Sequence, residues 1–162
     1  MSNQELREAV MEMGTIEREL YVEATPAVVF EVVSDPTHMK QWWSDDARYE
    51  TVVGSEGEIL FADADGGKVE ALTVVEVQPP TRFSFRWTHP AGEEAVEGNS
   101  LLVTFELVPQ GAGTLVRFRE TGFRERGWTA AVEQATYEDH VQGWDYFLPR
   151  LVTHAAALGA RP

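Results

Sequence analysis

The clearest hydrophobic pattern in the chain lies between Tyr137 and Leu158. Apolar side chains recur there every three or four residues, with charged and amide side chains between them, which is typical of an amphipathic helix. The stripe consists of Tyr137, His140, Val141, Trp144, Phe147, Leu148, Leu151, Val152, Ala155 and Leu158. The predicted helix is about 33 Å long, and Gly159 is expected to end it. Because such a helix needs a broad apolar partner, we expect it to pack against a sheet.

The middle of the chain shows the two-residue alternation of half-buried strands. Aromatic side chains alternate with polar ones from Arg82 to Trp87, and we expect the aromatic side chains to point inward. Gly- and Pro-rich turns separate the segments, so neighbouring strands should be antiparallel. The predicted strands cover residues 15–22, 47–52, 57–62, 68–78, 82–89, 100–108 and 114–121.

Two short helices are predicted between the first two strands. Thr25 is a good N-cap and Pro26 suits the first helical position, so a helix should run from there to Ser34. A second helix is expected from Pro36 to Trp43. Residues 122–134 are interpreted as a long connection to the C-terminal helix. Residues 1–14 should form an N-terminal tail or a short helix, and residues 15–160 should form one domain.

Composition narrows the class of protein. The 162 residues, 43% of them hydrophobic, suffice for one domain with its own core. A formal net charge of -14 would repel phosphate backbones and anionic bilayers, so nucleic acid is not an expected partner. The absence of cysteine excludes disulfides and thiolate chemistry. With no signal-peptide pattern and no long apolar run, we predict a cytoplasmic protein that does not insert into membranes.

Several short motifs occur in a characteristic order. They are Ala24-Thr25-Pro26, Trp42-Trp43, the turn at residues 76–82, Gly111-Ala112-Gly113-Thr114 and Gly143-Trp144. Together they resemble the START-like (SRPBCC) superfamily, and within it the AHSA type, which is related to the activator of the heat-shock-protein ATPase. The resemblance covers about residues 15–158 and implies an α+β helix-grip fold. In that fold a curved antiparallel sheet of six to seven strands wraps around a long C-terminal helix.

The resemblance also implies a cavity between the sheet, the long helix and the two short helices. Such pockets are mostly apolar with a few placed polar groups. The inward-facing aromatic candidates are Trp42, Trp43, Phe61, Phe83, Phe85, Trp87, Phe105, Phe118, Trp144 and Phe147. Each of them can equally be an ordinary core residue, because aromatic side chains can fill a protein interior as well as line a cavity. Together they indicate a cavity for a flat or hydrophobic ligand.

Two polar residues join these candidates for ligand binding. The alternation along its strand predicts that Glu120 points inward, and His140 lies one helical turn before Trp144. An acid and an imidazole in one cavity could hold a ligand oxygen or move a proton. The alternatives are that Glu120 is solvated at a strand end and that His140 is a hydrogen-bonded core side chain. His89 is expected at the rim.

Three functions are compatible with these features. The protein could bind a small hydrophobic molecule such as a lipid or a polyketide, and we favour this hypothesis. It could also be a cyclase- or hydratase-like enzyme, with Glu120 and His140 as the candidate catalytic acid and base. A co-chaperone-like module that binds a chaperone is the third hypothesis. No spacing of histidines or glycines predicts a metal or cofactor, and the sequence leaves open whether the protein is a monomer or a homodimer.

Overall fold

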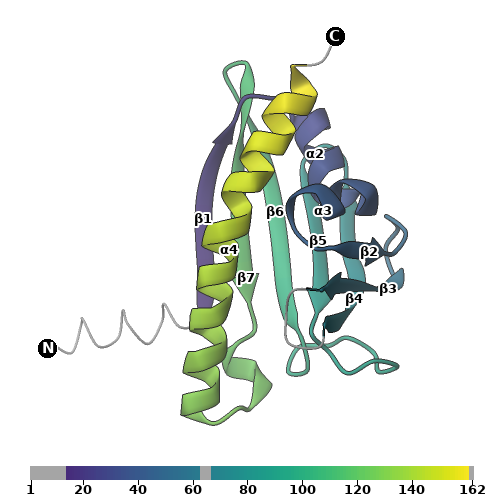
Figure 1. The fold of residues 1–162 in the computed structure, drawn as a ribbon, viewed down its shortest axis with the longest axis vertical. Coiled ribbons are helices and arrows are strands. Elements are labelled where there is room, and N and C mark those ends of the chain that lie inside the picture. The colour runs from purple at the N-terminus through teal and green to yellow at the C-terminus, as the bar shows by residue number, and fades with distance from the viewer. Residues whose placement is uncertain (1–13, 63–66, 161–162) are drawn as a thin grey trace, which may run out of the picture.

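The computed structural model describes residues 14–62 and 67–160. The predicted N-terminal tail or short helix lies outside the described residues, apart from Gly14. Seven strands form one antiparallel sheet in the order β1-β7-β6-β5-β4-β3-β2 (Figure 1). The strands are β1 (Thr15–Val22), β2 (Asp46–Arg48), β3 (Glu56–Phe61), β4 (Lys68–Gln78), β5 (Arg82–Trp87), β6 (Leu101–Gln110) and β7 (Gly113–Thr121).

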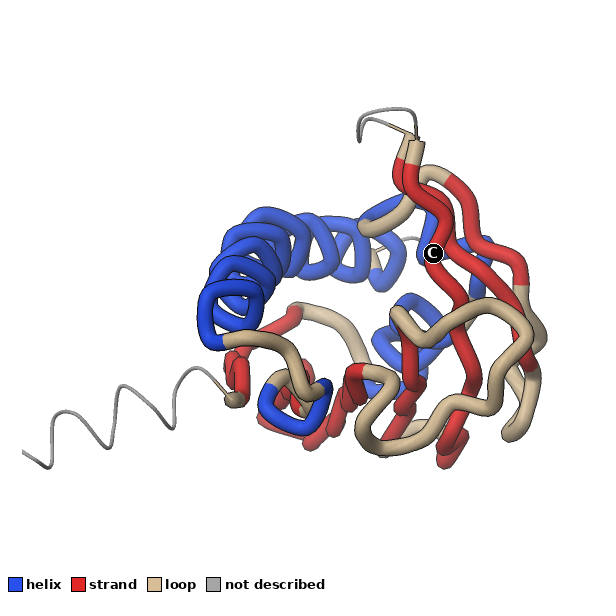
Figure 2. The backbone as a smooth tube through the Cα atoms, turned by 90° about the horizontal axis from the view of Figure 1, so that it is seen from below, coloured by secondary structure: helices blue, strands red, loops and turns tan. Residues whose placement is uncertain are grey.

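The three α-helices of the described residues lie on one side of this sheet. The two short ones, α2 (Pro26–Ser34) and α3 (Pro36–Trp42), follow β1 as predicted, and α4 (Ala130–Gly159) comes last. Thr25 and Asp35 cap the short helices, each accepting a backbone N–H from the first turn. Figure 2 shows the sheet curling around the helices. The prediction of a helix-grip α+β fold is therefore confirmed.

The long helix begins earlier than the hydrophobic pattern indicated. It starts at Ala130, seven residues before Tyr137, so the interpretation of residues 122–134 as a connection is wrong for residues 130–134. A short 3-10 helix, η1 (Arg124–Arg126), precedes it. Thr129 is the N-cap and accepts the backbone N–H three residues further on at 3.3 Å. Most side chains of the first two turns are exposed, so no apolar stripe marked this part.

The predicted strand over residues 47–52 is mostly loop. Its regular part, β2, ends at Arg48. The phenol of Tyr49 turns away and donates a 2.6 Å hydrogen bond to the carbonyl of Ser34 at the end of α2. Thr51 donates to the same carbonyl at 3.0 Å. This loop is thus tied to a helix rather than to a neighbouring strand, a contact that local alternation does not reveal.

The strand predicted over residues 82–89 ends at Trp87, because the backbone of Thr88 adopts a positive φ of 67°. That conformation is rare for a β-branched residue, and it reverses the alternation of side chains. His89 is therefore buried on the opposite face of the sheet from Trp87, with its Nε2 3.3 Å from Oγ1 of Thr73. The expectation of a rim position for His89 is wrong, because a turned backbone carries the ring to the outer face.

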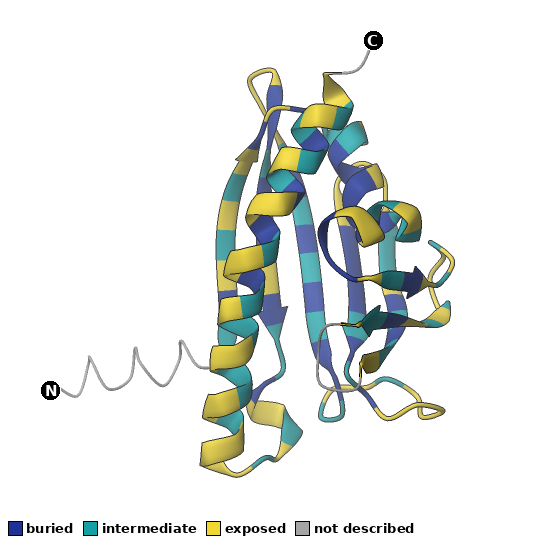
Figure 3. Ribbon diagram, viewed as in Figure 1, coloured by how far each residue is buried: buried dark blue, intermediate teal, exposed yellow. Residues whose placement is uncertain are grey.

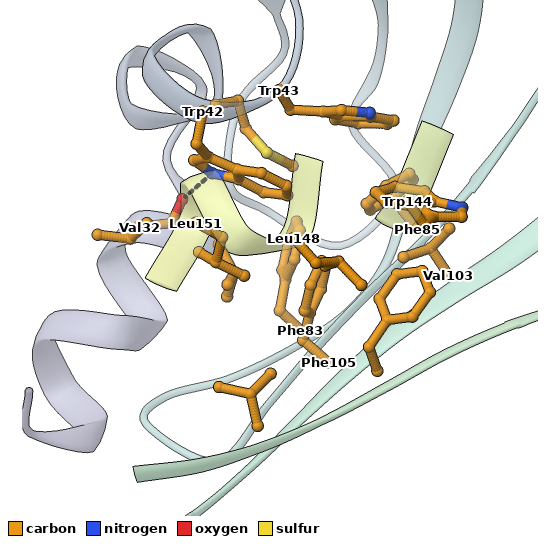
Figure 4. Packing of buried hydrophobic residues seen from close by; sticks show 14 of the residues in the cluster. Val32, Trp42, Trp43, Phe83, Phe85, Val103, Phe105, Trp144, Leu148 and Leu151 are labelled. Carbon is orange, nitrogen blue, oxygen red and sulfur yellow. Dashed lines mark hydrogen bonds between the residues drawn. The ribbon is translucent and has the colours of Figure 1, made fainter. Parts of the chain in front are cut away.

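The core fills the space between the concave face of the sheet and the helices. Buried positions alternate along the strands and form a stripe on α4 (Figure 3). The inward phenylalanines of the central strands are at most 1% exposed; they are Phe83, Phe85, Phe105 and Phe118. The indole of Trp42 donates a 3.0 Å hydrogen bond to the carbonyl of Val32 and so links α3 to α2 (Figure 4). The inward orientation predicted for the aromatic faces is confirmed.

Gly159 ends α4 as predicted, but for a packing reason. A Cβ atom there would lie 2.9 Å from the Cβ of Ala24. Glycine therefore allows the helix end to lie against the segment between β1 and α2. The same helix also contains Pro149, which removes one helical N–H without ending the helix.

Candidate functional site

The middle of α4 and the nearby parts of β4 and β5 leave a cleft of about 570 Å³ between them. Tyr146 at its edge is 61% exposed, and Asp139 and Gln142 are exposed as well, so the cleft opens to solvent. The lining consists of Trp43, Phe61, Lys68, Glu70, Trp87, Thr88, Asp139, His140, Gln142, Gly143, Trp144, Tyr146 and Phe147. Aromatic side chains from four different parts of the chain thus meet at one opening.

The aromatic part of the lining is tightly packed. The ring of Trp43, the residue that caps α3, stacks on Trp144 with centroids 5.0 Å apart (Figure 4). It meets Trp87 edge-on at 5.0 Å and Phe61 at 5.6 Å. The three tryptophans are at most 6% exposed. We call Trp43, Phe61, Trp87 and Trp144 the aromatic floor, whose mutual contacts hold it in one arrangement.

Behind this floor lies Glu120, a fully buried carboxylate on β7. Its Oε2 accepts a hydrogen bond from Nε1 of Trp87 at 2.7 Å. Its Oε1 accepts one from Nε1 of Trp144 at 2.8 Å and is 2.8 Å from Nδ1 of His140. A buried carboxylate is costly unless its oxygens are hydrogen-bonded. Here strand β5 and two turns of α4 supply three partners, so the acid is accommodated and it orients both indoles.

His140 lies between Glu120 and the cleft. Its ring packs against Trp87 at 5.3 Å and Phe123 at 5.4 Å, and its side chain is 9% exposed. Burial lowers the pKa of His140, but the negative charge of Glu120 and the hydrogen bond to it outweigh burial and raise this pKa above its usual value. Nδ1 is committed to Glu120. No residue within the described ranges hydrogen-bonds Nε2, so this nitrogen is available at the cleft.

Charged and polar groups surround the mouth of the cleft. Lys68 and Glu70, at the start of β4, form an ion pair of 3.3 Å. Thr88 also lines the cleft, because its left-handed backbone turns it to that side. Arg126 donates to Oγ1 of Thr88 at 2.8 Å and packs over the ring of Trp128 at 4.7 Å. The guanidinium thus holds the turn at the end of β5 in place.

Most of the chain matches the model of a known protein family. The profile described as "Activator of Hsp90 ATPase homolog 1-like protein" matches residues 23–156. The chain belongs to this family. The resemblance to the START-like superfamily, AHSA type, is thereby confirmed. A search among curated proteins finds no significant match.

Solved structures of low sequence identity share the fold of this family member. A protein from Mesorhizobium loti, MLL2253, has a TM-score of 0.67 at 23% identity, covering 86% of this chain and 94% of that one. A protein from Nitrosomonas europaea, NE0264, has a TM-score of 0.74 at 16% identity, covering 92% and 98%. The Aha1 dimer from Colwellia psychrerythraea has a TM-score of 0.61 at 21% identity, covering 91% and 98%. At these identities the likeness shows the fold alone.

The residues predicted to bind a ligand fall into two groups in this family member. Six of them line the cleft, namely Trp43, Phe61, Trp87, His140, Trp144 and Phe147. The others lie outside the lining and are buried in the core, namely Trp42, Phe83, Phe85, Phe105, Phe118 and Glu120. Glu120 and His140 are brought into contact at 2.8 Å. Their roles toward a ligand remain a prediction.

Sequence reasoning did not select seven lining residues, which are Lys68, Glu70, Thr88, Asp139, Gln142, Gly143 and Tyr146. A signal was present for three of them, and two of these, Lys68 and Glu70, share strand parity with the buried Leu72. Gly143 lies three residues after His140, on the same side of the helix. Thr88 could not be found from a pattern, because its place depends on one unusual backbone conformation.

The described part of the chain offers neither a metal site nor a membrane-spanning helix. Residues 14–62 and 67–160 contain no group of three or more His, Asp or Glu side chains that could hold a metal ion. None of the described helices is long and apolar enough to cross a membrane.

Proposed function

We propose that the protein binds a small hydrophobic or aromatic molecule in the cleft between α4 and the sheet. The observation that carries this proposal is the aromatic floor at the base of an opening of about 570 Å³. Ligand pockets in proteins typically measure about 300–1,000 Å³ and are mostly apolar. Each square ångström of apolar ligand surface removed from water contributes roughly 25 cal/mol.

The floor is organised before any ligand arrives. Both Trp87 and Trp144 are held by hydrogen bonds to Glu120, and Trp43 stacks between them and α3. A ligand therefore does not have to order these side chains, which reduces the cost of binding. Gly143 widens the opening on the helix side, since a Cβ atom there would meet nothing within 4 Å.

A thermal-shift screen against aromatic, polyketide-like and lipid-like compounds tests the proposal. A ligand at a hundred times its Kd should stabilise the fold by about 2.7 kcal/mol, which is a shift of several degrees for a domain of this size. Binding at the floor should also change tryptophan fluorescence. A screen in which no compound moves either signal would overturn the proposal.

Gly143→Leu supplies a matched test of location. Its side chain would enter the cleft without meeting the surrounding core, so it should weaken binding at least about tenfold while the protein stays folded. Ala157→Leu, on the exposed side of the same helix and outside the lining, is the control and should bind like wild type. Equal binding by all three proteins would place the ligand elsewhere.

The contact between Glu120 and His140 favours a second function, acid–base catalysis on the bound molecule. A carboxylate that fixes an imidazole beside a cleft is an arrangement suited to proton transfer. Mass spectrometry of screening hits after long incubation would detect turnover. Conversion that is abolished in Glu120→Gln would favour an enzyme, whereas hits recovered unchanged would favour binding alone. A co-chaperone role would rest on the family description by itself.

A further inference from the structure

The polar groups of the cleft lining differ in how deeply they lie. The side chain of Lys68 is 56% exposed, and that of Glu70 is 16% exposed and paired with Lys68. Asp139 is exposed on the helix. The side chain of His140 is only 9% exposed and packs directly against Trp87 of the aromatic floor. A polar group of a ligand that rests on this floor would therefore meet His140 first.

The partners of Glu120 determine what His140 offers. An indole N–H can only donate, so the bonds from Trp87 and Trp144 make both oxygens of Glu120 acceptors. Nδ1–H of His140 donates the third hydrogen bond to this carboxylate. Next to a carboxylate held in this way the imidazole is favoured in its protonated form. Nε2 then carries a proton and presents a charged donor to the cleft.

We infer that the cleft is selective for planar aromatic acids, whose ring lies on the aromatic floor and whose carboxylate accepts a hydrogen bond from Nε2 of His140. The inference rests on the proposed function and specifies its ligand class. A flat ring can stack on the indoles of the floor. A carboxylate forms a stronger hydrogen bond with a charged donor than a neutral acceptor does, and the edge of an apolar surface favours this bond further.

Other charges near His140 do not cancel this preference. Glu120 on β7 already accepts hydrogen bonds from three donors. Asp139 lines the cleft from the exposed side of α4, and its negative charge favours the protonated form of His140, whereas the charge of Lys68 opposes it. Lys68 and Glu70 form an ion pair, so their charges largely offset each other at the mouth. The net charge of -14 acts over distances at which salt screens it.

The test compares 2-naphthoate with its neutral isostere 2-naphthamide by calorimetry between pH 6 and pH 8.5. Naphthoate should bind the wild-type protein about tenfold or more tightly than naphthamide at pH 6, as expected of a hydrogen bond to a charged group. This ratio should fall as the pH rises and His140 loses its proton, whereas naphthamide affinity should stay nearly flat.

Two variants separate the sources of the preference. His140→Phe keeps an aromatic ring against Trp87 but removes Nε2, so naphthoate and naphthamide should bind it alike. Lys68→Gln should retain the preference, because its ammonium lies at the exposed mouth. Loss of the preference in Lys68→Gln together with its retention in His140→Phe would overturn the inference. Circular dichroism establishes that each variant is folded, and the pH series on the wild-type protein needs no variant.

The outcomes distinguish this inference from the proposed function. Equal affinity of naphthoate and naphthamide at every pH would overturn the acid preference and leave the binding function standing. Failure of both probes, while other compounds bind in the screen, would likewise overturn only the inference. A screen without any ligand would remove the function and the inference together.

Discussion

Trp87 donates a 2.7 Å hydrogen bond to the carboxylate of Glu120, which lies 33 positions further along the chain. The indole is 6% exposed and the carboxylate is fully buried. This pair joins β5 to β7 across the strand between them, and Trp144 and His140 extend the connection to α4. The polar centre of the fold and the floor of the cleft are therefore one structure.

Glu120→Gln should destabilise the protein by about 1–3 kcal/mol. The amide replaces one acceptor oxygen with an NH₂ donor, which must then face an indole N–H or Nδ1 of His140. Urea unfolding measures the change. Glu106→Gln, on the outer face with a side chain 40% exposed, is the control and should shift stability by about 0.5 kcal/mol or less. Equal unfolding midpoints for wild type and Glu120→Gln would contradict the described network.

Stability should fall with rising pH because of His140. Its pKa is raised in the folded state by Glu120 despite burial, so between the unfolded value of about 6.5 and this higher value the folded protein holds the extra proton. The stabilisation is full below pH 6.5 and is lost as pH rises through the folded pKa. The difference in unfolding free energy between wild type and His140→Phe, followed from pH 6 to pH 9, should decline. A constant difference would refute this linkage.

His89 should act in the opposite direction on the acid side. Burial lowers its pKa, and its Nδ1 lacks a hydrogen-bond partner among the described residues. Between the lowered folded pKa and about 6.5 the unfolded chain binds the extra proton, so this residue's contribution to stability rises with pH and is lost as pH falls. Imidazole NMR signals should show His89 titrating below His140. The reverse order would contradict the burial described for His89 and the contact with Glu120 described for His140.

Gly143→Ala should stabilise the protein by about 0.5–1 kcal/mol, because glycine inside a helix loses more backbone entropy on folding than alanine does. Nothing lies within 4 Å of the new Cβ atom. The same substitution at Gly57 is the contrast, since its Cβ would collide with the backbone carbonyl of Arg48, and it should destabilise. Thermal unfolding measures both, and a lowered midpoint for Gly143→Ala would mean that the space beside α4 is filled.

Trp144→Ala should cost about 3–5 kcal/mol. The indole is 2% exposed, packs on Phe118 with centroids 4.6 Å apart and donates to Glu120, so its loss opens a cavity and removes a donor. Tyr146→Ala, two positions away and 61% exposed, should change stability by about 0.5 kcal/mol or less. Similar unfolding midpoints for these two variants would argue against the packing described for Trp144.

Much of the fold was readable from the sequence because the signals are local. Alternation along a strand sets which side chains share a face, and it placed Phe85, Phe105 and Glu120 inward as the structure does. Capping is equally local, so Thr25 marked the start of α2. The start of α4 was missed because the first turns of that helix bury little and carry no stripe.

The order of the elements and the inward faces could be predicted from the chain alone, because both follow from side-chain periodicity over a few residues. Which inward aromatic residues form the aromatic floor and which form the core depends instead on how distant elements pack. Trp43 lines the cleft and Trp42 does not, and this depends on where α3 and α4 cross the sheet. The hydrogen bonds to Glu120 join residues 20 to 33 positions apart. Such contacts form only when packing brings distant segments together, and no periodicity in the chain encodes them.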